Sequence, residues 1–97
     1  MEAKLRNAAL VEKENVADLK FPGEEVLLSV EAVKLRKADL DKALKLGNAE
    51  KGKTRIIFED SESVKQVETT IWGVTDKRII LKQGVVIPIH RIHEVRI

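Results

Sequence analysis

The stretch from residue 72 to residue 95, WGVTDKRIILKQGVVIPIHRIHEV, decides the fold that this chain is expected to adopt. Its apolar residues come in short runs, and turn-forming pairs separate the runs. Thr75 and Asp76 have side chains that bond their own backbone, and Gly84 after Gln83 tolerates the positive φ that a tight turn needs. The stretch therefore predicts consecutive antiparallel strands joined by tight turns.

Pro88 interrupts one of these runs and limits how its strand can pair. Proline has no N–H to give to a ladder. Either the strand lies at a sheet edge, or the position of the missing N–H points away from a neighbour.

Apolar patterns upstream extend the series of strands. Residues 25–36 are apolar on both parities, which predicts a strand buried on both sides or one that bends between faces. Residues 42–46 predict a short strand, although a helical turn starting at Asp39 also fits them. A loop is expected from Gly47 to Gly52. The remaining predicted strands are 54–59, 63–74 after a loop at 60–62, and three short runs from Lys77 to the end of the chain.

The first twenty residues have a different composition, rich in Ala, Leu, Lys and Glu. We expect one amphipathic helix within residues 3–20, ended by Pro22 and Gly23, although Asn15 could act as an internal cap that splits it. The predicted organisation is an N-terminal helix in residues 1–20 and a β domain in residues 21–97. The predicted fold class is mainly β (α+β), a small antiparallel barrel or sandwich of about seven strands behind one α-helix.

Composition narrows the classes of function. The chain has 97 residues, which fits one domain, and it has no cysteine for a disulfide, a thiol nucleophile or a cysteine metal site. Aromatic residues make up 3% and the net charge is +2, both of which disfavour nucleic-acid binding. No apolar run approaches the ~20 residues of a membrane span. We expect a cytoplasmic protein, either free or peripheral to a membrane.

The pattern of residues 72–95 resembles the signature of the pleckstrin-homology superfamily, in its bacterial PH and GRAM-like branches. The matching positions are Trp72, Thr75, Asp76, Arg78, Pro88 and Ile92. The phrase FPGEEVLL at residues 21–28 is similar to the opening strand of GRAM-like domains. The resemblance implies a PH-like barrel with Trp72 in its core or at its rim.

PH-like barrels usually have a helix after the last strand, which closes one end. Because this chain ends in strand-like sequence, the N-terminal helix is expected to cover the barrel instead, with Leu19 and Phe21 closest to the sheet. If that helix cannot reach, a second chain is expected to cover the end. The alternative is that the chain is a fragment whose closing helix lies beyond Ile97.

A basic cluster is the main candidate for a binding surface. It consists of Lys34, Arg36, Lys37, Lys42 and Lys45. The resemblance places these residues around the loop that holds anionic headgroups in lipid-binding members, but Asp39 and Asp41 in that loop would repel a phosphate. Three interpretations stay open: a solvated charged rim, an anionic membrane surface, and a contact with a protein partner or a second copy.

Catalytic chemistry is poorly represented in the sequence. His90 and His93 are spaced so that a strand would point them to opposite faces, which predicts solvent-facing or hydrogen-bonding histidines and no metal site. Ser63, Thr69 and Thr70 have no evident base beside them. The sequence predicts no enzyme, no cofactor and no small-molecule substrate. It predicts a non-catalytic PH-like binding or assembly module with a protein partner or homo-oligomer; the alternative is a small nucleic-acid-binding barrel.

Overall fold

A long helix, α3 (Val30–Glu50), is the central element of the protein, which a computed structural model describes over residues 8–50 and 52–97. Ser29 caps the helix: its Oγ accepts a hydrogen bond from the Ala32 N–H at 3.1 Å. The Ser29 carbonyl accepts a second one from the Val33 N–H at 3.2 Å. Such a cap satisfies N–H groups that the first turn of a helix leaves without partners.

The expected strands at residues 25–36 and 42–46 are therefore wrong, and the helical alternative from Asp39 is confirmed. Arg36, Leu40, Ala43 and Gly47 are buried, and their spacing of three or four residues is that of one helical face. The expected loop after Gly47 is also wrong in its first part, because α3 continues to Glu50.

Two open sheets replace the predicted closed barrel. The first has the order β1-β3-β2-β7 and is mixed, because β1 runs parallel to β3; the second has the antiparallel order β4-β5-β6. The strands are β1 (Ala9–Leu10), β2 (Thr54–Glu59), β3 (Val64–Thr69), β4 (Ile71–Val74), β5 (Arg78–Leu81), β6 (Val86–Pro88) and β7 (Ile92–Arg96). One-turn 3-10 helices, η1 (Lys82–Gly84) and η2 (Ile89–Arg91), flank β6.

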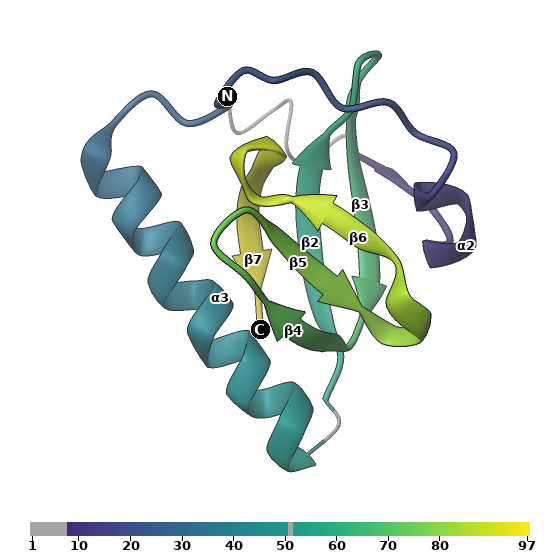
Figure 1. Ribbon diagram of the computed structural model, residues 1–97, viewed down its shortest axis with the longest axis vertical. Coiled ribbons are helices and arrows are strands. Elements are labelled where there is room, and N and C mark those ends of the chain that lie inside the picture. The colour runs from purple at the N-terminus through teal and green to yellow at the C-terminus, as the bar shows by residue number, and fades with distance from the viewer. Residues whose placement is uncertain (1–7, 51) are drawn as a thin grey trace.

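This arrangement is an α+β fold and contradicts the PH-like barrel. The long helix follows β1 and precedes strands β2 to β7, whereas the PH fold has its helix after the last strand. Figure 1 shows α3 lying along one side of the strands, where it packs against β4 and β7. Gly47 permits a close approach, because a Cβ there would lie 2.5 Å from the Ile71 carbonyl oxygen.

The strands and turns of the second half agree better with the sequence. The strand predicted at 54–59 and the loop at 60–62 are confirmed. The run predicted at 63–74 divides at Thr70 into β3 and β4, which belong to different sheets. The turn at Gln83 and Gly84 is confirmed, with φ values of 69° and 84°.

The N-terminal segment does not form the predicted helix. Among the described residues of the range 3–20, β1 is followed by the one-turn helix α2 (Lys13–Val16); residues 3–7 lie outside the described part of the chain. Leu19 and Phe21 do pack against the core as expected. The Phe21 ring lies 6.0 Å from that of Phe58, measured between centroids.

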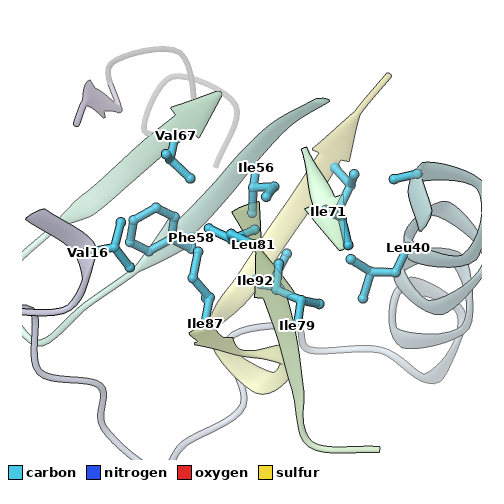
Figure 2. Close-up of a cluster of buried hydrophobic side chains, with 12 residues drawn as sticks. Val16, Leu40, Ile56, Phe58, Val67, Ile71, Ile79, Leu81, Ile87 and Ile92 are labelled. Carbon is cyan, nitrogen blue, oxygen red and sulfur yellow. The ribbon is translucent and has the colours of Figure 1, made fainter. Parts of the chain in front are cut away.

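One main core joins all these parts. Figure 2 shows Val16 of α2 beside Phe58 of β2, and Leu40 of α3 directed toward Ile71 and Ile79 of the second sheet. The side chains of Phe58, Ile71 and Ile79 are fully buried. Because α2, α3 and both sheets contribute to one cluster, the segment before residue 21 is held by the same core as the strands.

Candidate functional site

A large cavity lies between the N-terminal segment and the edge of the second sheet. Its volume is about 900 Å³, and it is open on one side. Figure 1 shows the connection from α2 to α3 running over the top of the strands, and residues of this connection line the cavity together with residues of β6. Its apolar lining comes from Val16, Leu19, Phe21, Val85, Val86 and Ile89.

Strand β6 borders this cavity with a free edge. Its only sheet neighbour is β5, with Ile79 opposite Ile87. Hydrogen bonds run from Leu81 N–H to the Val85 carbonyl at 2.6 Å and from Ile89 N–H to the Lys77 carbonyl at 2.9 Å. One of these bonds lies just before β6 and the other just after it.

The alternation of an antiparallel ladder then fixes where the backbone of β6 points. Ile87 faces β5, so the backbone groups of Val86 and Pro88 point away from β5. Within residues 8–50 and 52–97, the Val86 N–H and the Val86 carbonyl have no hydrogen-bond partner. Pro88 is the N-cap of η2, and the carbonyl of an N-cap residue accepts the first hydrogen bond of its helix. The edge position predicted as one alternative for Pro88 is confirmed.

The opposite wall of the cavity is held in place by the segment that follows β6. The His90 Nε2 lies 2.9 Å from the Pro22 carbonyl oxygen, and since that oxygen can only accept, Nε2 carries the proton. The Val26 N–H donates to the His90 carbonyl at 2.9 Å. Arg91 Nη1 donates to the Glu24 carbonyl at 2.7 Å. These bonds fix residues 22–26 without any regular secondary structure.

Arg36 and Glu25 form an ion pair at the border of the cavity. Arg36 donates through Nη1 and Nη2 to the two carboxylate oxygens of Glu25, at 2.7 Å and 2.6 Å. Nη1 also donates to the Ile92 carbonyl at 3.0 Å. The Arg36 side chain is 5% exposed and that of Glu25 is 36% exposed. Partial burial raises the pKa of Glu25, but the hydrogen bonds from Arg36 and the Leu27 N–H outweigh it, so the pKa lies below its ordinary value.

The third nitrogen of this guanidinium has no partner. Arg36 Nε is buried and makes no hydrogen bond to any described residue. A buried donor without an acceptor costs about 1–3 kcal/mol. Arg36 borders both the large cavity and a smaller neighbouring one that also contacts Asp76 and Ile89.

Charged side chains lie at the mouth of the cavity. Asp76, Lys77 and Arg78 are exposed in the turn before and at the start of β5. The side chains of Lys77 and Arg78 make no ion pair with another described residue. With one anion against two cations, the mouth carries a local charge of +1 beside the neutralised Arg36–Glu25 pair.

The basic cluster predicted from the sequence lies elsewhere, on α3. Lys34, Lys37, Lys42 and Lys45 are exposed on that helix. Arg36 is not part of the exposed surface, because it is buried with Glu25. The structure therefore places all five predicted residues on α3, four of them exposed and the fifth, Arg36, buried in an ion pair.

The residues of the signature are dispersed. Trp72 is 53% exposed, so the expectation of a core position is wrong and only the rim position fits. Ile92 is fully buried in the core. Thr75 closes the hairpin as expected: its Oγ1 accepts hydrogen bonds from the Lys77 and Arg78 N–H groups at 3.2 Å and 3.0 Å.

The two histidines are hydrogen-bonding residues, as the sequence predicts. His90 bonds Pro22, and the His93 Nε2 lies 2.8 Å from Glu59 Oε1 with its side chain 5% exposed. In the described part of the chain, no three His, Cys, Asp or Glu residues gather as a metal site would require.

Sequence reasoning missed the cavity and the roles of Val86 and Arg91. The one usable signal was Pro88, which marks an edge, next to the apolar pair Val85 and Val86.

Comparisons add no relative to this description. The chain matches no protein-family model, no curated protein and no solved structure. Among residues 8–50 and 52–97, no helix is both long and apolar enough to cross a membrane.

Proposed function

We propose that this chain is a non-catalytic binding module that takes its partner into the cavity between residues 16–25 and strand β6. The observation that carries the proposal is the cavity itself. Ligand sites are usually apolar concavities of ~300–1,000 Å³ with a few convergent polar groups. This one has about 900 Å³, an apolar lining and, beside it, the backbone groups of Val86 and the guanidinium of Arg36.

The arrangement favours binding over chemistry. The polar groups at the cavity are backbone N–H and carbonyl groups, one neutralised ion pair and exposed charges. The lining side chains of types that act as bases are His90, Glu25 and Asp76; His90 donates to the Pro22 carbonyl through Nε2, and Glu25 is paired with Arg36. A nucleophile with a base beside it, the usual arrangement for covalent catalysis, is not found around this cavity.

The test uses anilinonaphthalene sulfonate, a dye that combines apolar rings with one negative charge. We expect its fluorescence to rise with saturable binding to the folded protein. Ala17→Trp puts a large side chain at the cavity wall from an exposed position and should weaken that binding. Ala38→Trp, at an exposed position of α3, is the matched control and should leave it unchanged. Equal binding by all three proteins would reject this cavity as the site.

A second candidate function is association with an anionic membrane surface through α3. The specific observation is that Lys34 and Lys37 are exposed on the same helix as Leu35, which is 63% exposed. Cations beside exposed apolar side chains are typical of helices that lie on a membrane.

A further inference from the structure

We infer that the partner is an extended peptide segment that adds to β6 as a new edge strand, with apolar side chains alternating along it and an acidic residue at its Pro88 end. This inference rests on the proposed function and names the partner of the same site. It is carried by three features of the cavity: a free strand edge, an apolar wall facing that edge and unpaired cations at one end.

The free edge supplies the backbone recognition. Val86 offers one donor and one acceptor, both directed away from β5. An added strand satisfies such groups with its own N–H and carbonyl groups, independently of its side chains. The N–H and carbonyl of one edge residue are the two groups that a neighbouring antiparallel strand pairs with in a ladder.

The apolar wall supplies the preference for alternating side chains. Successive side chains of a strand point to opposite faces. On one face, an added strand would meet Leu19, Phe21 and Val16 across the cavity. Every second side chain of the partner is therefore apolar, and those between face solvent.

The cations supply the acidic residue. Arg78 lies opposite Pro88 in the ladder, and the Lys77 carbonyl accepts from Ile89, so both cations lie at the Pro88 end of β6. Neither side chain is paired with an acid among the described residues, and Asp76 offsets only one of the two charges. A carboxylate on the partner complements this end.

Pro88 limits the same edge. Any other residue at position 88 would present an N–H directed away from β5, as Val86 does. The backbone of Pro88, at φ −65° and ψ 133°, has a conformation that any residue can adopt in a strand. Exposed edges are often blunted by proline, which prevents unselective pairing. A partner strand therefore pairs with this edge only if it does not require an N–H donor from residue 88.

The experiment selects binders from a library of random short peptides displayed on phage, with the wild-type protein as bait. We expect the enriched peptides to alternate apolar residues and to carry Asp or Glu near one end. The best of them, made as a synthetic peptide, should slow hydrogen exchange at the Val86 amide. Lys77→Glu combined with Arg78→Glu should shift the selection from acidic to basic peptides.

Two backbone variants decide whether the peptide adds as a strand. Val86→Pro removes the outward N–H without removing a bond to β5, and Val85, at φ −69° and ψ 139°, has the conformation that a residue before proline prefers. We expect it to weaken the peptide roughly tenfold, the effect of one well-made hydrogen bond, while Val86→Thr, which keeps the N–H, has little effect. Pro88→Ala, which adds a donor, should tighten binding by about threefold to tenfold.

The other outcomes separate this inference from the proposed function. If peptides bind the wild-type protein, Val86→Pro and Pro88→Ala equally well and do not protect the Val86 amide, strand addition is overturned. The proposal of a binding module would still stand. The same holds if the dye enters the cavity and no peptide is enriched. A wild-type dimer in sedimentation that Val86→Pro converts to a monomer would make a second copy the occupant and overturn the peptide. Failure of both dye and peptides to bind would reject site and inference together.

Discussion

The ion pair of Arg36 and Glu25 shows how burial determines the cost in stability of removing one charged side chain. The charge of Arg36 is held by Glu25, which reaches water while Arg36 does not. Removing one member of a buried pair is costly mainly when the charge left behind cannot be solvated. We therefore expect Glu25→Ala to lower the free energy of unfolding by about 3–5 kcal/mol, and Arg36→Met by about 1–2 kcal/mol. Urea unfolding followed by circular dichroism measures both, and a larger loss for Arg36→Met would contradict this account.

Trp72 gives a second prediction for a single residue. A core position, one of the two that the resemblance implied for Trp72, would give a loss of about 3–5 kcal/mol on Trp72→Ala. Because Trp72 is 53% exposed, we now expect a loss under about 1 kcal/mol. Phe58→Ala, at a fully buried position, should cost about 3–5 kcal/mol. Circular dichroism in urea is the suitable measurement, because Trp72 is the only tryptophan that fluorescence could report.

Among the elements, α3 carries the prediction for membranes. Each lysine near an anionic surface contributes about 1 kcal/mol of attraction, which salt screens. We expect Lys34→Glu combined with Lys37→Glu to abolish sedimentation with phosphatidylserine vesicles at low salt. Lys20→Glu combined with Lys82→Glu makes the same charge change away from α3 and should not. If the wild-type protein does not sediment with these vesicles, the membrane function is rejected.

The elements also show what the sequence could predict. Local turn chemistry was sufficient for the hairpins, since Thr75 and Asp60 bond the backbone of their own turns. It failed for α3, where Val30 and Val33 suggested a strand while Ser29 and the spacing of Leu40 and Ala43 were the helical signals. The helix forms because the burial of one of its faces outweighs the strand propensity of two valines.

The candidate site could not be predicted from the sequence, for a different physical reason. Its two walls, residues 16–25 and β6, are about sixty positions apart and meet through hydrogen bonds from His90 and Arg91. Such contacts depend on the whole arrangement of the strands. Only Pro88, as the mark of an edge, pointed to one of the walls.

At the scale of the whole molecule, two carboxylates contribute to stability through hydrogen bonds that they accept from cations and backbone N–H groups. Glu25 ties the segment before α3 to Arg36. Asp60 accepts from the N–H groups of Glu62 and Ser63 through Oδ1 and from Lys65 Nζ at 2.7 Å through Oδ2. Burial raises the pKa of Asp60, but the bonds from Lys65 and the two N–H groups outweigh it, so the pKa lies below its ordinary value of 3.8.

Both carboxylates make the stability of the fold depend on acid in a defined direction. A carboxyl whose pKa is lower in the folded than in the unfolded state stabilises fully above the unfolded pKa, and that contribution is lost as the pH falls through the folded pKa. We expect the wild-type protein to be more stable than Asp60→Asn combined with Glu25→Gln at about pH 6, and this difference to shrink toward about pH 2. Urea unfolding across that range measures it. A difference that stays constant with pH would show that the two ionised carboxylates do not stabilise the fold.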